Sequence, residues 1–126
     1  MKEEIYSHKV PKPIGPYSQA IKINNLIFIS GQIAIDIKKE KLITKNIKEE
    51  TTTIMENIGN ILSESNCTFK NVVKSSIFLS NINLFEEVNK VYKSYFSKPY
   101  PARETIEVSR LPKNVNIEIS MIAISK

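Results

Sequence analysis

The sequence predicts an α+β domain in which one sheet carries two helices on a single face. Segments of strand and helix character follow one another as strands, helix, strand, helix and two final strands. Two helices can cover only one side of such a sheet. The chain has 126 residues, of which 41% are hydrophobic and 25% charged, as is ordinary for one globular domain spanning residues 1–126.

The first third of the chain is predicted to form short strands around a rigid loop. Residues 3–8 have the composition of a short strand, and residues 19–24 alternate weakly between apolar and polar. Residues 11–16 hold three of the six prolines, so this segment cannot be helical and is expected to be a loop. The apolar run 26–29 predicts a buried strand that ends in a tight turn at residues 30–31.

A helix is predicted over residues 47–65. Asn46, followed three residues later by Glu49, has the pattern of a capping box at a helix start. Apolar residues then recur at helical spacing on one face, namely Ile47, Ile54, Ile58, Ile61 and Leu62. The preceding residues 36–45 are polar and are expected to be a loop.

A further strand and a second helix follow. Residues 72–80 are rich in β-branched and aromatic side chains, which favours a strand. Asn83 and Glu86 repeat the capping pattern, so a helix is predicted over residues 84–97, and Pro99 lies beyond its end. Its apolar stripe consists of Leu84, Val88, Val91, Tyr92, Tyr95 and Phe96.

The C-terminal segment predicts two strands and an assembly. Residues 102–109 and 115–125 are expected to be strands, joined by a turn over residues 111–114. The last strand is apolar on both sides, with Ile117, Ile119 and Met121 on one and Ile122 and Ile124 on the other. Because the helices cover one face of the sheet, its other apolar face needs a second chain, and we expect an oligomer.

Composition argues against several kinds of site. The single cysteine, Cys67, rules out an internal disulfide and a multi-cysteine zinc site. The chain has one histidine, so we expect no metal; we interpret His8 as a surface residue and Cys67 as a structural residue near a helix end. No apolar run approaches the roughly 18 residues of a membrane span. The first four residues lack the apolar core of a signal peptide, so we expect a cytoplasmic protein without membrane contact.

The chain is basic, a property that invites a nucleic-acid partner. Its formal net charge is +5, and 16 of its 18 basic residues are lysine. The lysines are scattered and no basic stripe is interleaved with aromatic residues, which favours a solvated basic surface over a polyanion site. Because arginine is so rare here, Arg103 and Arg110 are candidates for places that need a planar, bidentate donor.

Three residues are candidates for chemistry. Glu118 lies in a strand otherwise fit for burial; it either faces water or is partly buried with a raised pKa, which suits proton transfer. Arg103 either forms a surface salt bridge or recognises a carboxylate. The Ser30 hydroxyl has no evident base, so it is better suited to donating a hydrogen bond than to acting as a nucleophile.

Several separated motifs resemble the Rid family (YjgF-like reactive intermediate deaminases), and its RidA subgroup in particular. They are GPYSQA at 15–20, ISGQI at 29–33, YPAR at 100–103, and IEVSRLP at 106–112 followed by IEI at 117–119. They occur in the family's order and at its spacing over nearly the whole chain. The resemblance implies a chorismate-mutase-like fold whose last strand inserts centrally into the sheet, and a homotrimer with three clefts between subunits.

The resemblance also implies a reaction. RidA-like proteins hydrolyse 2-imino acids, such as 2-iminobutanoate and 2-iminopropanoate, to 2-oxo acids and ammonia without a cofactor or metal. By motif position, Arg103 would hold the substrate carboxylate with help from the Gly31 N–H, and Glu118 would activate the water or carry its proton. The other residues implied in the cleft are Tyr17, Ser30, Asn89 and Thr105, the last through its backbone.

Two positions depart from the pattern of many RidA proteins. Thr105 stands where many have Cys, so redox or chaperone activities that depend on that Cys are in doubt here. Glu104 stands where many have Ser or Thr, next to Arg103 in the sequence. Alternation along the strand places it on the other face, so we expect little competition for the arginine.

Three functions remain open from the sequence. Imine deamination is favoured by Arg103 together with Glu118. An RNA-directed role is suggested because some Rid relatives are labelled translation inhibitors or endoribonucleases, but a ribonuclease needs an acid–base pair near a phosphate clamp and this chain has one histidine. The third is a trimer that binds small acids without catalysis. We expect a small 2-imino acid as ligand and no specific nucleic acid.

Overall fold

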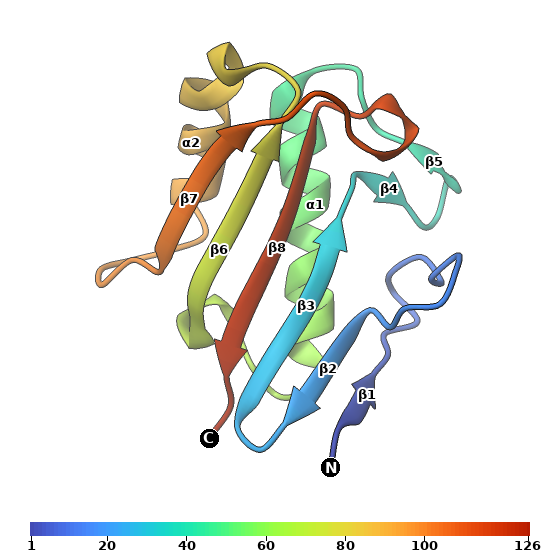
Figure 1. The fold of residues 1–126 in the computed structure, drawn as a ribbon, viewed down its shortest axis with the longest axis vertical. Coiled ribbons are helices and arrows are strands. Elements are labelled where there is room, and N and C mark those ends of the chain that lie inside the picture. Colours follow the sequence, from blue (N-terminus) through green and yellow to red (C-terminus); the bar gives the residue numbers. More distant parts are fainter.

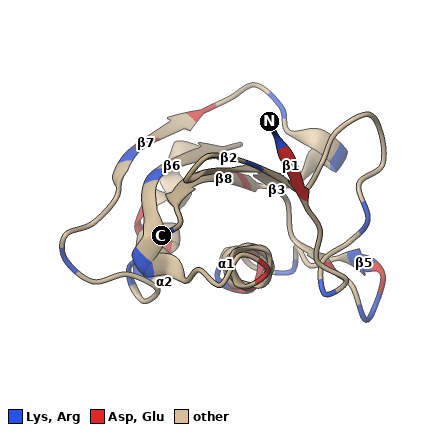
Figure 2. Ribbon diagram, turned by 90° about the horizontal axis from the view of Figure 1, so that it is seen from below, with Lys and Arg blue, Asp and Glu red and all other residues tan.

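A six-stranded sheet forms one layer of the structure and two helices form the other (Figure 1). The computed structural model describes all of residues 1–126. The strands of the sheet are β1 (Glu3–Ile5), β2 (Ala20–Ile23), β3 (Leu26–Gln32), β6 (Val72–Leu79), β7 (Ala102–Glu107) and β8 (Ile117–Ile124). The helices, α1 (Ile47–Ser63) and α2 (Phe85–Lys93), lie on the same side of it (Figure 2). The predicted α+β architecture is confirmed.

The last strand lies in the middle of the sheet. The strand order is β1-β2-β3-β8-β6-β7, so β8 pairs antiparallel with both β3 and β6. β7 pairs parallel with β6, which makes the sheet mixed. The central insertion of the last strand, implied by the resemblance to the Rid family, is therefore confirmed.

The prediction of a tight turn at residues 30–31 is wrong. β3 continues to Gln32, and its register with β8 shifts by one residue between Ile29 and Gln32. Ser30 and Gly31 thus form a β-bulge. An apolar run followed by glycine is compatible with a bulge as well as with a turn, because glycine inside a strand marks either feature.

A short hairpin replaces the loop expected over residues 36–45. β4 (Ile35–Asp36) pairs with β5 (Lys41–Leu42) as a separate two-stranded sheet. The side-chain amide of Asn57 on α1 donates a hydrogen bond of 2.9 Å to the carbonyl of Ile35. The hairpin is therefore tied to the helix layer, a long-range contact that local sequence pattern does not reveal.

The start of α1 agrees with prediction, but that of α2 does not. Asn46 Oδ1 accepts the Glu49 N–H at 2.8 Å, and α1 ends at Ser63, two residues earlier than expected. Asn83 does not cap α2: Asn81 caps a 3-10 turn over Ile82–Leu84, and α2 continues from that turn without a side-chain cap.

α2 ends at Lys93, four residues before its predicted end. Tyr95 and Phe96 leave the helix and pack their rings against Phe69, with centroids 5.2 and 5.4 Å apart. Tertiary packing therefore ends the helix before the prolines do.

The two sides of β8 have different environments. Ile117, Ile119, Met121 and Ala123 are buried against the helices. The alternate residues point to the other side, on which neither helix lies (Figure 2). The large apolar side chains exposed on this open face are Ile23, Leu26, Phe28, Ile106 and Ile124. The open apolar face expected from the sequence is therefore present.

We expect the protein to be a homotrimer in solution, with a mass about three times 14.4 kDa by light scattering. Phe28→Lys should reduce the mass, because it places a charge on the open face. Ile82→Lys is the matched control, since Ile82 is 44% exposed and Phe28 41%, but Ile82 lies in a 3-10 turn. A monomeric wild-type chain at micromolar concentration would contradict this expectation.

Candidate functional site

Glu118 lies on the open face of β8. It pairs with Phe78 of β6, whereas its neighbours Ile117 and Ile119 are fully buried on the helix side. Its side chain is partly buried, and this desolvation raises the pKa of the carboxyl above its ordinary value. Of the two environments considered for Glu118 from the sequence, the structure shows the partly buried one with a raised pKa.

Gly31 lies directly beneath the Glu118 carboxylate. A Cβ at position 31 would overlap the carboxylate and would lie only 2.8 Å from its carbon Cδ. The bulge places Gly31 without a register partner on β8, so backbone and carboxylate approach each other closely. The lack of a side chain at Gly31 leaves the space that the Glu118 carboxylate occupies, and a larger residue would displace this carboxylate.

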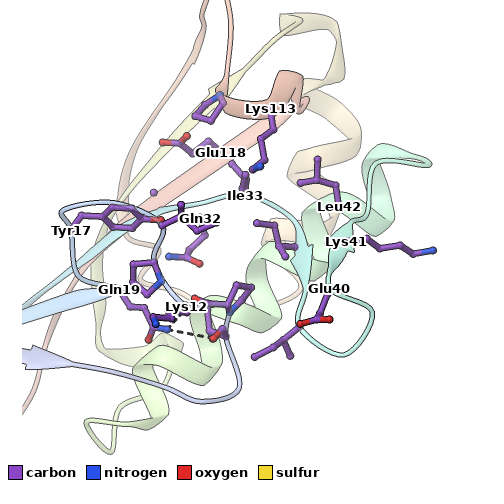
Figure 3. Close-up of a pocket in the computed structure, with 18 of the residues that line it drawn as sticks. Lys12, Tyr17, Gln19, Gln32, Ile33, Glu40, Lys41, Leu42, Lys113 and Glu118 are labelled. Atoms are coloured by element: carbon purple, nitrogen blue, oxygen red, sulfur yellow. Dashed lines mark hydrogen bonds between the residues drawn. The ribbon is translucent and has the colours of Figure 1, made fainter.

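Glu118 and Gly31 line an open pocket of about 810 Å³ together with Tyr17 (Figure 3). Tyr17 comes from the proline-rich loop between β1 and β2 and is exposed. Lys113, from the turn before β8, extends into the same pocket. The pocket can therefore hold a small polar molecule near a basic carboxylate, with a phenol and an ammonium group at its margin.

Ser30 supports this pocket without lining it. Its hydroxyl donates a hydrogen bond of 2.6 Å to the carbonyl of Ser18, and its backbone N–H donates to the carbonyl of Gln19. These bonds attach the loop that carries Tyr17 to the bulge in β3. The hydroxyl is thus a hydrogen-bond donor, as preferred from the sequence.

Arg103 lies on the other face of the sheet. It pairs with Ser75 of β6, which pairs with the buried Met121 of β8, and paired residues share a face. Its guanidinium Nη1 donates a hydrogen bond of 2.7 Å to Asn89 Oδ1 on α2. Glu118 lies three residues before Met121 on β8. Because side chains alternate along a strand, Glu118 faces the side opposite to Met121 and Arg103.

One copy of the chain therefore separates the predicted residues into two groups. Glu118, Gly31 and Tyr17 meet at the pocket on the open face. Arg103 and Asn89 meet beside α2.

Thr105 belongs to the second group by position. It lies two residues beyond Arg103 on the same side of β7, and its buried Oγ1 has no hydrogen-bond partner. The expected contact between the Thr105 backbone and a ligand stays a prediction.

The acid next to Arg103 in the sequence does not reach it. Glu104 forms an ion pair of 2.9 Å with Lys74 and a hydrogen bond with the Ser76 hydroxyl, both on the open face. These partners lower the pKa of the Glu104 carboxyl, the hydrogen bond from Ser76 most. The expectation that Glu104 faces away from Arg103 is confirmed.

A buried carboxylate that the sequence pattern did not reveal positions β8. Glu50 on α1 is inaccessible to solvent and accepts two hydrogen bonds of 2.8 Å from Asn116, one from the backbone N–H and one from the side-chain amide. These bonds hold the chain two residues before Glu118. Its position on the apolar side of the helix, between Ile47 and Ile54, is the signal that could have revealed it.

One further residue lies at the same pocket. His8 is exposed, as expected from the sequence, and packs edge-on against Tyr6 with ring centroids 5.0 Å apart, but it also lines the pocket that holds Glu118. Cys67 is buried just after α1, as expected of a structural residue near a helix end. Arg110 is exposed. No group of three or more His, Cys, Asp or Glu side chains could hold a metal ion. Neither helix combines the length and apolar character needed to cross a membrane.

Comparison with known proteins agrees with this geometry. The family model described as Endoribonuclease L-PSP matches residues 7–125. A RutC family protein of Pyrococcus abyssi is 49% identical, over 97% of this chain and 96% of its own. The human 2-iminobutanoate/2-iminopropanoate deaminase is 43% identical, over 95% of this chain and 88% of its own.

The crystal structure of RidA from an Antarctic Psychrobacter superposes with a TM-score of 0.92 at 34% identity, covering 97% of this chain and 98% of the other. The two proteins therefore share the same fold. The chain belongs to the L-PSP family, also called the Rid family, and the resemblance of its motifs is confirmed.

Gly31→Ala should lower the free energy of unfolding by up to about 1 kcal/mol, because the new methyl group displaces the end of the Glu118 side chain. The same substitution in a Glu118→Ala background should cost almost nothing. Denaturant unfolding of the four proteins at one concentration measures this coupling. An equal cost in both backgrounds would show that something other than Glu118 requires glycine at this position.

Proposed function

We propose that the protein hydrolyses 2-imino acids, such as 2-iminobutanoate and 2-iminopropanoate, to 2-oxo acids and ammonia in clefts between copies of the chain. The opposite placement of Glu118 and Arg103 carries this proposal. One copy presents a carboxylate of raised pKa and another presents a guanidinium, so a single substrate contacts both only where two copies meet. The human and bovine relatives named as this deaminase are each 43% identical to the chain.

The open face of the sheet provides the surface for such a meeting. Leu26 and Phe28 on β3 and Ile124 on β8 are exposed on the same face as Glu118, and neither helix lies on this face. In the proposed trimer each cleft takes Glu118, Gly31 and Tyr17 from one subunit and Arg103 with Asn89 from the next. The proposed number of three subunits rests on the resemblance to the Rid family, and the open apolar face of the sheet supports an assembly of more than one copy.

Binding of the substrate carboxylate begins the proposed reaction. Arg103 forms a bidentate pair with this carboxylate, and the Gly31 N–H donates to it from the bulge. The fork fixes the plane of the carboxylate, which is also the plane of the adjoining C=N bond. Fixing both reactants in this way can supply several kcal/mol of the barrier reduction.

Water then adds to the protonated imine. The water oxygen forms a bond to C2 while Glu118 takes one of the water protons, which produces a neutral carbinolamine. The Glu118 carboxyl next gives this proton to the amino nitrogen, the C–N bond breaks, and ammonia leaves as the C2 hydroxyl becomes a carbonyl. The remaining proton passes from that oxygen to ammonia, so the products are a 2-oxo acid and ammonium.

Mixing two inactive variants tests the shared cleft. Arg103→Ala and Glu118→Gln should each be inactive when a threonine dehydratase supplies the imine and 2-oxo acid release is followed. Unfolding and refolding an equal mixture should restore roughly a quarter of the wild-type activity. In a random mixed trimer, about one cleft in four receives an intact Glu118 from one chain and an intact Arg103 from the next. Refolded mixtures of wild type with each variant control for recovery. If the mixture stays inactive while these controls recover, the two residues do not come from different chains.

Glu118→Gln also tests proton transfer. Glutamine keeps the shape of the side chain but accepts no proton, so kcat/KM should fall by about 10²–10⁴-fold while the trimer persists. In the wild type, kcat/KM should decline as pH falls, because protonated Glu118 cannot act as a base. Burial raises the pKa of Glu118, so this decline should begin above the range of an ordinary glutamate. Near-normal rates in the variant would assign Glu118 a positioning role only.

The second candidate is an RNA-directed activity, which the description of the matching family model as an endoribonuclease favours. The single histidine is exposed and forms no ion pair with an acid, although it lines the same pocket as Glu118. Lysines are spread over the ribbon instead of forming one stripe (Figure 2). These features support an unspecific electrostatic attraction to polyanions.

RNA binding should therefore be weak, independent of sequence, and lost between roughly 50 and 200 mM salt. Filter binding or fluorescence anisotropy with two unrelated single-stranded oligonucleotides at several salt concentrations measures this. Sequence-specific cleavage that persists in highly purified protein, and that disappears in a Glu118→Gln or Arg103→Ala variant, would favour the RNA-directed function instead.

A further inference from the structure

One side of α2 surrounds the Arg103 guanidinium. Phe85, Asn89 and Tyr92 follow one another at spacings of four and three residues, so they share a side of the helix. The guanidinium carbon lies 5.4 Å from the centre of the Phe85 ring and 5.0 Å from that of Tyr92, over both rings. Asn89 adds the hydrogen bond of 2.7 Å to Nη1.

Tyr92 is itself fixed by the sheet. Its hydroxyl donates a hydrogen bond of 2.9 Å to Ser75 Oγ, and Ser75 is the fully buried partner of Arg103 across β6 and β7. Tyr92 is therefore attached at its hydroxyl to the residue beside Arg103, while its ring supports the guanidinium. The Arg103 guanidinium is therefore held from α2 by Asn89 and Tyr92, and Tyr92 is in turn held by Ser75 on the strand next to Arg103.

We propose that Phe85, Asn89 and Tyr92 form a cradle that fixes the plane of the Arg103 guanidinium before a carboxylate arrives. Asn89 and Tyr92 are then positioning residues that act through Arg103, and Asn89 is not primarily a substrate contact. The inference rests on the proposed function for the identity of the carboxylate, but the cradle is complete within one chain.

The chemistry of the contacts supports this assignment. Only the carbonyl oxygen of Asn89 can accept from the guanidinium, so the amide is oriented by Arg103. The guanidinium carbon lies over both rings and only Nη1 donates to a protein group, so other N–H groups can donate two parallel hydrogen bonds to a planar carboxylate. A fixed side chain also loses less conformational freedom on binding than a mobile one.

Binding of 2-oxobutanoate, measured by calorimetry, tests the cradle without requiring turnover. Asn89→Ala and Tyr92→Leu should each weaken binding roughly 3- to 10-fold, because Arg103 must then be immobilised by the ligand. Tyr92→Phe retains the ring and should weaken binding less than Tyr92→Leu. Asn83→Ala removes an exposed asparagine from the turn before α2 and is the matched control, expected to bind as the wild type does.

A double-mutant cycle separates positioning from direct contact. If Asn89 and Tyr92 act through Arg103, neither substitution should weaken binding further in an Arg103→Ala background. A further loss there for Asn89→Ala would show that Asn89 touches the ligand itself and would overturn the inference. Asn89→Ala leaves the buried core unchanged, so the cycle remains informative if Tyr92→Leu melts at a much lower temperature.

The outcomes distinguish the cradle from the proposed reaction. Carboxylate binding that follows the expected cycle in a protein without deaminase activity would uphold the cradle and contradict the reaction. Deaminase activity in the wild type, together with unchanged 2-oxobutanoate affinity in Asn89→Ala and Tyr92→Leu, would uphold the reaction and contradict the cradle. A wild-type protein that binds no carboxylate would overturn the cradle.

Discussion

The central position of β8 determines how the rest of the molecule is arranged. A strand paired on both edges must satisfy two environments, and alternation of its side chains assigns every second residue to each. Ile117, Ile119 and Met121 bury against the helices and supply much of the core. Glu118 falls between them on the opposite side. The same pairing that builds the core therefore presents an acid to the surface where another copy is expected.

The bulge in β3 makes this presentation possible. A regular strand would place a paired residue beside the Glu118 carboxylate, whereas the bulge inserts Ser30 and Gly31 opposite a single position. Gly31 yields the space that the carboxylate occupies, and Ser30 ties the Tyr17 loop to the strand. Glu50 fixes the other end of the arrangement through Asn116. The bulge and the Glu50–Asn116 hydrogen bonds thus fix the strand segments on either side of Glu118, and burial raises the pKa of this carboxyl.

Sequence pattern predicted what depends on local spacing. The apolar stripes located both helices, Asn46 located the start of α1, and the alternation in β8 revealed the open face. Pattern could not distinguish a bulge from a turn at residues 30–31, since both follow an apolar run ending at glycine. The end of α2 depends on Tyr95 and Phe96 packing against Phe69, a contact between distant segments. The motifs named the candidate site residues, but they did not reveal that these residues lie on two faces of the sheet, because only the strand order fixes the faces.

Arg103 is held by groups that leave its charge uncompensated. The chain contains an acid in the next position, but Glu104 is directed to the open face and neutralised there by Lys74. The partners that remain around the guanidinium are an amide oxygen and two aromatic rings. A carboxylate in the same place would orient the arginine equally well, yet it would compete with any anionic ligand and reduce the net positive charge of the site. Neutral acceptors and π faces orient the cation without that competition, which is the arrangement that recognition of a substrate carboxylate requires.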